Sequence, residues 1–282
     1  MKCAWESLIN ILPVWMRSDV DKFGRDYLQE IRLRINQYPE FVGCKETIKF
    51  SRMISAEDLS FCINVTSRYS PWAATTISKG YITAPGGHRV GICGECTVSK
   101  DTMHGIRIPT SVCIRVARDF QNIASKALRY DGSVLIIGAP GVGKTTLLRD
   151  YIRQLSDVRG EFVSVVDERE EIFPTANGQA CFYPGKHTDV LSGCSKPKGI
   201  EILLRNMTPH TIAVDEITAE EDCEALLHAG WCGVKLLATA HAGCKQDLLN
   251  RPIYKPLIDS GVFDTLLIMN FDKTWTGERL CK

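Results

Sequence analysis

The second part of the chain contains short, largely apolar runs that alternate with segments of helical pattern. Runs of this kind are typical of strands that are buried on both faces of a sheet. The segment after the first run places apolar side chains on one helical face, from Leu147 to Leu155. We therefore expect an α/β fold with a mostly parallel sheet that helices cover. The runs are Val134–Ile137, Phe162–Val166, Thr211–Val214, Val234–Ala238 and Thr265–Met269.

The first part of the chain follows a different pattern, in which single apolar and polar residues alternate. Glu30–Ile35 and Ser111–Ala117 alternate in this way and are predicted to be half-buried strands. Residues 80–92 predict a hairpin around a glycine-rich turn, and Ser55–Asp58 has the capping-box pattern that opens a helix. We expect a smaller α+β domain over residues 1–118 and an α/β domain over residues 119–282.

The composition is that of an ordinary globular protein, with 282 residues, 44% hydrophobic and 24% charged residues, and a net charge of +1. A net charge so close to zero gives no support to binding of nucleic acid, and none is expected. No apolar stretch is long enough for a transmembrane helix, and the first ten residues do not resemble a signal peptide. These features predict a cytoplasmic protein, which could be peripheral at a membrane through partners.

The 12 cysteines are scattered along the chain, which favours reduced thiols over a disulfide framework. The only close pair is Cys93 and Cys96. A zinc site requires a second pair or a Cys/His partner at similar spacing, and none is evident, so no metal is expected there.

Residues 138–145 fit the phosphate-binding pattern G-x-x-x-x-G-K-[ST] at every fixed position, between an apolar strand and an amphipathic helix. Glycines allow the loop to wrap closely around phosphates, and the helix N-terminus supplies an anion site. Lys144 is expected to reach the β- and γ-phosphates of ATP, and the Thr145 hydroxyl to bind Mg²⁺. The predicted nucleotide-binding residues are Gly138, Ala139, Pro140, Gly141, Val142, Gly143, Lys144, Thr145 and Thr146.

A P-loop requires an acidic residue on a neighbouring strand to hold the hydrated Mg²⁺. The run Thr211–Val214 ends in Asp215 and Glu216. Asp215 is predicted to be the Mg²⁺ residue, and Glu216 the base that orients or activates the attacking water. The alternative is that Asp215 caps the helix that follows.

Two further strand ends carry polar residues that the same edge of the sheet would bring to the site. Asp167, Glu168 and Glu171 follow the second run, and at least one of them should approach the γ-phosphate, Mg²⁺ or water. Their alternative is a solvated charge cluster. His241 follows the fourth run, where it could sense the γ-phosphate or have a structural role.

The alternation of the first part also orients two arginines. Val90 and Ile92 face inward, so Arg89 faces outward, and the same reasoning orients Arg115. An outward arginine on a rigid strand can act as an arginine finger. The alternative is an exposed charge or a local ion pair.

Two classes of P-loop protein fit poorly. Asn270–Lys273 does not match the guanine motif N-K-x-D, which argues against a GTPase. Leu191–Ser195 begins like the LSGGQ motif of ABC ATPases but lacks its second glycine and its glutamine, so we interpret it as a loop.

The order of four blocks resembles the type II and type IV secretion ATPases: the P-loop, the acids near Asp167, the pair Asp215-Glu216, and Thr239-Ala240-His241. Residues 30–34, Glu-Ile-Arg-Leu-Arg, resemble a strand of the N-terminal domain of that family. This resemblance implies a RecA-like P-loop core, a hexamer, and finger roles for Arg89 and Arg115.

A more specific resemblance is to the stage III sporulation protein AA family. It rests on blocks throughout the chain, at residues 28–34, 86–94, 147–150, 166–169 and 251–255. It implies a cytoplasmic ATPase that energises a membrane channel complex during endospore formation, by contact with small membrane subunits. Two alternatives stay open: a nucleic-acid motor on a RecA-like core, and a scaffold that binds ATP as a switch with little turnover.

Overall fold

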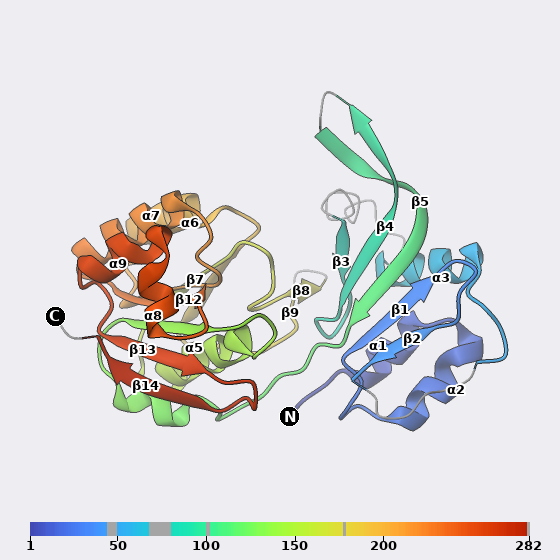
Figure 1. The fold of residues 1–282 in the computed structure, drawn as a ribbon, viewed down its shortest axis with the longest axis horizontal. Helices are drawn as coiled ribbons and strands as arrows, with labels where there is room; N and C mark the ends of the chain where they lie inside the picture. The colour runs from blue at the N-terminus through green and yellow to red at the C-terminus, as the bar shows by residue number, and fades with distance from the viewer. Residues whose placement is uncertain (44–49, 68–79, 100–101, 177–178, 281–282) are drawn as a thin grey trace. The chain divides into compact units, whose positions relative to one another are not determined.

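The fold was analysed in a computed structural model, which describes residues 1–43, 50–67, 80–99, 102–176 and 179–280. The chain divides into two compact units (Figure 1). The first comprises Met1–Asp119 together with Pro174–Phe182, and the second comprises Phe120–Phe173 and Tyr183–Lys282. The chain therefore passes between the units three times. A linear division at residues 118/119, which stays a proposal, would leave Pro174–Phe182 outside the first unit.

The first unit is an antiparallel sheet of five strands with helices packed against it. The predicted alternation is confirmed, since Ile31, Leu33, Val112 and Ile114 are buried in one core. The predicted capping box is also present, because Ser55 and Asp58 exchange backbone and side-chain hydrogen bonds. The strands, in the order β2-β1-β5-β4-β3, are β1 (Glu30–Arg34), β2 (Glu40–Val42), β3 (Tyr81–Thr83), β4 (Arg89–Ser99) and β5 (Thr102–Arg115), and the helices are α1 (Trp5–Ile11), α2 (Val14–Phe23) and α3 (Ala56–Ser67).

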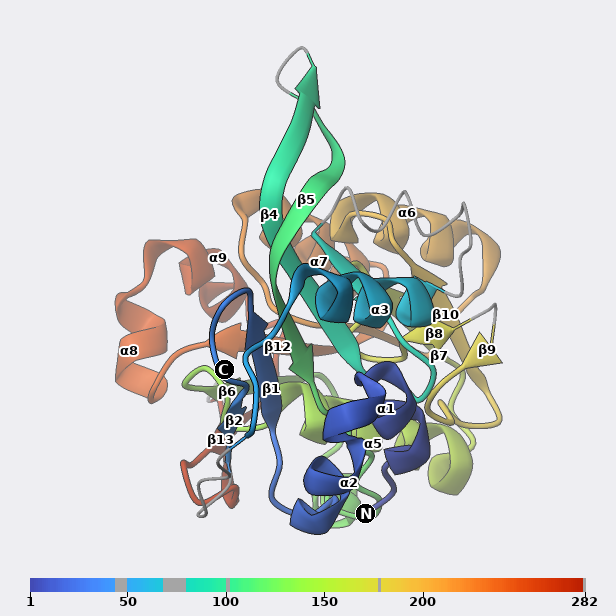
Figure 2. The same cartoon turned by 90° about the vertical axis from the view of Figure 1, so that its right-hand side faces the viewer.

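Strands β4 and β5 continue beyond the rest of this sheet as a long two-stranded arm (Figure 2). The sequence pattern predicted a strand that ended at Ile92, because the alternation of apolar residues stops there. The pairing in the arm shifts register at Cys93/Gly94 and again at Glu95/Cys96. Cys93 and Cys96 lie in this irregular region, and both are exposed.

The second unit is a seven-stranded sheet in the order β10-β7-β11-β12-β6-β13-β14, parallel except for β14. All five predicted runs are strands of this sheet. The strands are β6 (Val134–Gly138), β7 (Val163–Asp167), β10 (Thr188–Ser192), β11 (Thr211–Val214), β12 (Lys235–His241), β13 (Thr265–Met269) and β14 (Trp275–Arg279). The helices are α5 (Lys144–Arg159), α6 (Lys196–Asn206), α7 (Glu220–Trp231), α8 (Lys245–Asn250) and α9 (Lys255–Asp259), with short 3₁₀ turns at Ser125–Arg129 and Pro252–Tyr254.

Two strands of this unit were not predicted, and both lie at edges of the sheet. The interpretation of Leu191–Ser195 as a loop is wrong in part, since Leu191 and Ser192 belong to β10. Edge strands bury less apolar surface than central ones, so they lack the continuous apolar run on which the prediction relied. The remaining strands, β8 (Thr175–Ala176) and β9 (Gln179–Ala180), belong to the first unit and pair with each other in antiparallel fashion.

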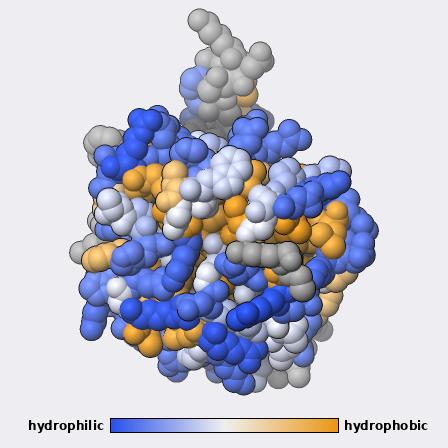
Figure 3. Space-filling view, turned by 90° about the vertical axis from the view of Figure 1, so that its left-hand side faces the viewer, coloured by the Kyte–Doolittle hydropathy of each residue, from blue (hydrophilic) through white to orange (hydrophobic). Residues whose placement is uncertain are grey.

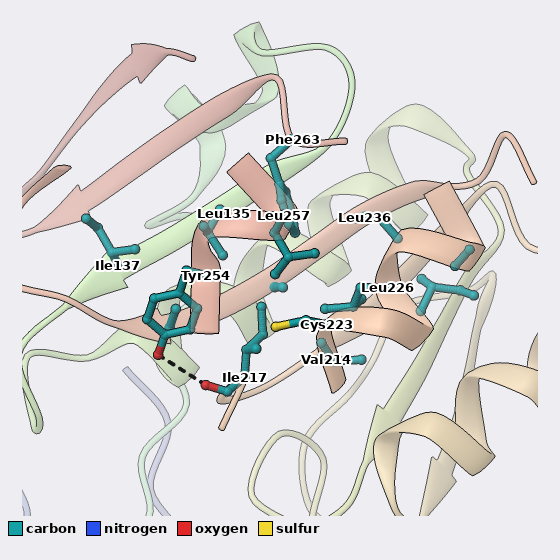
Figure 4. Close-up of a cluster of buried hydrophobic side chains, with 14 of the residues drawn as sticks. Leu135, Ile137, Val214, Ile217, Cys223, Leu226, Leu236, Tyr254, Leu257 and Phe263 are labelled. Atoms are coloured by element: carbon teal, nitrogen blue, oxygen red, sulfur yellow. Dashed lines mark hydrogen bonds between the residues drawn. The ribbon is translucent and has the colours of Figure 1, made fainter. Parts of the chain in front are cut away.

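A dense core fixes the strand ends that carry the polar residues. Figure 4 shows side chains of β6 and β11 packed against α7 and α9, with Leu135, Val214 and Leu257 buried. The hydroxyl of Tyr254 donates a hydrogen bond of 3.2 Å to the carbonyl of Ile217, just beyond the end of β11. This packing holds the loop after β11 in place.

The surface shown in Figure 3 mixes apolar and polar side chains. Within the described residues, no helix combines the length and the apolar character needed to cross a bilayer.

Candidate nucleotide site

The glycine-rich loop connects β6, which ends at Gly138, to α5, which begins at Lys144. Gly141 and Gly143 have φ angles of 75° and 107°, a left-handed conformation that glycine adopts without strain. A Cβ atom at Gly138 would lie 2.7 Å from Val142 Cγ2 and 2.9 Å from Met269 Cβ. The loop therefore requires glycine where it packs against β13, and it presents the N-terminus of a sixteen-residue helix, an arrangement that binds anions.

The side chain of Lys144 is buried at the base of this loop. Its Nζ donates to the carbonyl oxygens of Gly138 at 2.9 Å and Ala139 at 3.0 Å, and it contacts His241 Nδ1 at 3.0 Å. Burial lowers the pKa of Lys144, while the charges of Asp215 and Glu216 act in the opposite direction. The lysine is thus held by contacts within the protein, close to where the loop would hold phosphates.

Asp215 lies opposite the start of α5 and joins three elements. The hydroxyl of Thr145 donates to Asp215 Oδ2 at 2.6 Å, and the hydroxyl of Thr239 donates to Oδ1. The alternative role, as the cap of the next helix, is wrong. That helix, α7, begins only at Glu220. The carboxylate of Asp222, in its first turn, accepts hydrogen bonds from the N–H groups of Thr218 and Ala219.

Both carboxylate oxygens of Glu216 are occupied. Oε1 lies 3.0 Å from His241 Nε2, and Oε2 lies 2.7 Å from an Arg169 guanidinium nitrogen. The backbone of Glu216 is left-handed, with φ of 50°, and its N–H donates to the Thr239 hydroxyl at 2.8 Å. A non-glycine residue in this conformation is uncommon and costs conformational energy, a feature that is concentrated at functional sites.

The acidic cluster after β7 divides into two environments. Asp167 is buried and accepts N–H groups from Glu171, Ile172 and Phe173 at 2.8–3.0 Å, so it shapes the loop that follows. Burial raises the pKa of Asp167, and these hydrogen bonds oppose the shift. Glu168 instead pairs with Lys196 at 2.6 Å, and Lys196 also contacts Asp222 at 3.3 Å.

One cleft at the carboxyl edge of the sheet is lined by Asp167, Glu168, Arg169, Glu171, Lys196, Asp215 and Glu216. Hydrogen bonds connect Asp215 to Thr145 of the P-loop, and Glu216 through His241 to Lys144. The structure therefore brings together residues of the P-loop, Asp215, Glu216, Glu168 and His241. Sequence reasoning missed Arg169 and Lys196, which line the same cleft. Arg169 stood within the predicted acidic cluster, but nothing in its local sequence marks its pairing with Glu216.

Arg89 and Arg115 belong to the first unit and lie opposite one another on β4 and β5. Arg115 is 64% exposed, as predicted, and its Nε lies 3.6 Å from Glu30. The guanidinium of Arg89 stacks at 3.9 Å over the ring of Tyr81. Their roles as arginine fingers stay a prediction.

Residues 5–278 match the protein family described as sporulation stage III, protein AA. The chain belongs to the sporulation stage III protein AA family. It is 34% identical over 273 residues to stage III sporulation protein AA of Bacillus subtilis (strain 168). The aligned region covers 92% of this chain and 89% of that protein. The specific resemblance drawn from the sequence blocks is confirmed.

Two solved structures share the fold of this stage III AA family member. The Legionella pneumophila ATPase DotB has a TM-score of 0.56 at 18% identity, covering 89% of this chain and 76% of that one. The pilus retraction motor PilT, solved with bound ADP, has a TM-score of 0.57 at 13% identity, covering 91% and 78%. At these identities the likeness shows the fold alone, a RecA-like core preceded by a smaller α+β part.

The geometry of this site fits Mg²⁺ and a polyphosphate. The Thr145 hydroxyl and the Asp215 carboxylate are hard oxygen donors within 2.6 Å of one another, and Mg²⁺ is held by such groups together with phosphate and water. The glycine conformations and the helix N-terminus suit phosphate oxygens.

Proposed function

We propose that the chain is a Mg²⁺-dependent ATPase that cleaves a phosphoric anhydride and acts as a motor. The observation that carries this proposal is the chain of contacts from Lys144 through His241 to Glu216. Beside it, Thr145 and Asp215 are in contact across the start of α5. The proposed phosphate-binding lysine and the proposed base are thereby held in one connected set of side chains.

Each group has a defined task in this reaction. Lys144 exchanges its carbonyl partners for phosphate oxygens. Thr145 and Asp215 would hold Mg²⁺, which would supply positive charge against the phosphates. Glu216 orients a water molecule and accepts its proton while the water oxygen bonds to the γ-phosphorus. The bond from that phosphorus to the β–γ bridging oxygen breaks, giving ADP and phosphate. Glu168 helps to position this edge of the site through Lys196.

The arginines of the first unit complete the proposal. Arg115 is exposed on a rigid strand of the sheet, as a residue that acts on a nucleotide of its own or a neighbouring subunit must be. Arg89 lies opposite it. If these arginines act between subunits, hydrolysis requires a ring, and a homo-hexamer is proposed. Nucleotide binding and hydrolysis would then alternately draw together and release the two units of a subunit.

The family supplies the setting of this activity. We propose a cytoplasmic motor, peripheral at a membrane, that energises or assembles a channel complex during endospore formation through small membrane subunits. The formal net charge of +1 supports a protein partner over nucleic acid.

One observation favours a second function, an ATP-binding switch with little turnover. Arg169 and His241 occupy both oxygens of Glu216 in the ligand-free arrangement. If nucleotide binding left the ion pair with Arg169 intact, Glu216 would stay oriented toward that guanidinium and not toward the attacking water. The chain would then bind ATP and change conformation without hydrolysing it.

The deciding experiment measures steady-state ATP hydrolysis against protein concentration, with molar mass followed by light scattering. Wild type is compared with Glu216→Gln and with the matched control Glu224→Gln, an exposed glutamate of α7. We expect turnover to rise as a ring forms. Glu216→Gln should lower turnover by about 10²-fold or more while it still binds ATP, because a general base contributes 10²–10⁴-fold.

The outcomes separate the proposals. Tight ATP binding without turnover in any assembly state, also in the presence of the membrane subunits, would favour the switch. Absence of ATP binding in the wild-type chain would overturn both functions. Equal losses in Glu216→Gln and Glu224→Gln would show that the position is not special.

A further inference from the structure

The turn between β13 and β14 lies directly against the phosphate loop. Lys273 Nζ donates a hydrogen bond of 2.6 Å to the carbonyl of Gly141, the exposed glycine at the middle of the loop. Strand β13 pairs in parallel with β6, and its last residue, Met269, packs against Gly138. The turn, residues 270–273, is therefore a neighbour of the loop that the proposed reaction does not use.

The order of the strands fixes the direction in which a nucleotide would lie. Asp215, Glu216 and His241 follow or end β11 and β12, on one side of β6, whereas β13 and β14 lie on the other side. This inference rests on the proposed function, in which the γ-phosphate faces β11 and β12. The α-phosphate and the nucleoside must then leave the loop on the side of β13.

Phe271 occupies the tip of this turn and is 82% exposed, more than any other large hydrophobic side chain in the described part of the chain. A phenylalanine ring exposed to water on a globular surface is a ready platform for a flat apolar partner. Aromatic side chains stack on nucleic-acid bases with little dependence on base identity, because every base has a π-face.

The turn is held by its own hydrogen bonds. The N–H of Asn270 donates to the Thr274 carbonyl at 2.9 Å, and the Thr274 hydroxyl donates to Asp272 at 2.6 Å. Strand β14 is tied to the preceding segment of the same unit, since Trp275 Nε1 donates to the Ile123 carbonyl at 3.3 Å. The ring of Phe271 is therefore carried on an ordered turn, so little backbone freedom is lost when a ligand stacks on it.

We propose that the β13–β14 turn is the nucleoside subsite of the phosphate loop. Phe271 stacks on the base, and Lys273 transfers its hydrogen bond from Gly141 to an α-phosphate oxygen. The subsite takes nucleoside di- and triphosphates, favours the larger purine rings for their greater stacking area, and discriminates weakly between adenine and guanine.

The test compares ATP with inorganic tripolyphosphate, each with Mg²⁺, by isothermal titration calorimetry. Tripolyphosphate offers the same three phosphates without a nucleoside. We expect Phe271→Ala to weaken ATP binding about 5- to 150-fold, the range for loss of one base stack, and to leave tripolyphosphate binding unchanged. Phe271→Trp should preserve ATP affinity, and bound ATP should quench its added fluorescence.

The matched control is Phe162→Ala, which removes a half-exposed phenylalanine ring that precedes β7, at the opposite end of the parallel strands. It should leave both affinities unchanged. Equal ATP affinities of wild type and Phe271→Ala would overturn the subsite alone, as would equal losses for ATP and tripolyphosphate. Failure of the wild type to bind either compound would overturn the proposed function together with the subsite.

Discussion

Lys144, the first residue of α5, and His241, the last residue of β12, are in contact at 3.0 Å, Nζ to Nδ1. Because the ammonium can only donate, Nδ1 must accept, and the hydrogen of the neutral imidazole lies on Nε2. That hydrogen then points to Glu216 Oε1 at 3.0 Å. The imidazole thus contacts both the P-loop lysine and the Glu216 carboxylate, so that the positions of these two groups depend on one another.

Removal of this imidazole should separate binding from turnover. We expect His241→Ala to lower kcat by about tenfold or more, because Glu216 loses the group that orients it, a share of the 10²–10⁴-fold that a general base supplies. ATP affinity should change little. Steady-state kinetics and calorimetry measure both quantities, and His228→Ala, on the exposed side of α7, is the control. Unchanged kcat in His241→Ala would limit this residue to a structural role.

The finger role of Arg115 can be tested against another exposed arginine of the same strand. Arginine fingers contribute about 10³–10⁵-fold, so Arg115→Gln should lower kcat by about three orders of magnitude or more. Its thermal unfolding should be unchanged, because the side chain is 64% exposed. Arg107→Gln, which breaks an exposed pair with Glu95, should leave kcat unchanged. Equal kinetics for the two variants would contradict the finger role.

Stability should depend on pH through His88. This side chain is fully buried, with Nε2 3.0 Å from the Ala4 carbonyl and Nδ1 accepting the Ala117 N–H at 3.1 Å. Burial lowers the pKa of His88 below its ordinary value of 6.5. Between the folded pKa and 6.5 the unfolded chain therefore binds more protons. This contribution is fully present above pH 6.5 and is lost as pH falls through the folded pKa.

Urea unfolding between pH 5 and 8 measures this effect. His88→Gln should lower the free energy of unfolding by about 1–3 kcal/mol at pH 7.5, since buried polar atoms lose a partner. The variant should also flatten the dependence on pH below 6.5, whereas the exposed His228→Gln should keep the wild-type slope. A slope that persists in His88→Gln would assign it to other groups.

Gly138 should tolerate no side chain. The Cβ of Gly138→Ala would meet Val142 and Met269 closer than 3.0 Å, and such overpacking costs about 1–3 kcal/mol of stability. The displaced loop should also bind ATP and tripolyphosphate more weakly. Gly105→Ala is the control, because nothing lies within 4 Å of the added atom. Equal unfolding midpoints for the two variants would show that β6 and β13 adjust to the methyl group at no cost.

The sequence predicted those features that short segments encode by themselves. The central strands, the loop at Gly138 and the helix after it follow from local hydrophobic pattern and glycine spacing. The edge strands β10 and β14 were not predicted, because a strand at the edge of a sheet needs no continuous apolar run. The length of the β4–β5 arm was not predicted either, since the register shifts near Cys93 and Cys96 interrupt the alternation of apolar and polar residues.

Within the site, the missing part was the network of ion pairs. The pairing of Arg169 with Glu216, and of Lys196 with Glu168 and Asp222, joins residues far apart in sequence. Charged residues on a sequence look alike whether they are solvated or paired. Only the arrangement of the strand ends decides which of them meet, and that arrangement is a property of the whole sheet.

The excursion of Pro174–Phe182 into the first unit has a consequence for dissecting the protein into fragments. Pro174 and Phe182 pack around Gly87, where an added Cβ would lie 3.1 Å from each side chain. A fragment of residues 120–282 would carry this segment without its partner, exposing apolar surface that favours aggregation. Co-expressed with residues 1–119, the same fragment would regain a surface to fold against, and co-purification of the two pieces would reveal it. The protein is thus better suited to splitting into complementing halves than to study as an isolated ATPase core.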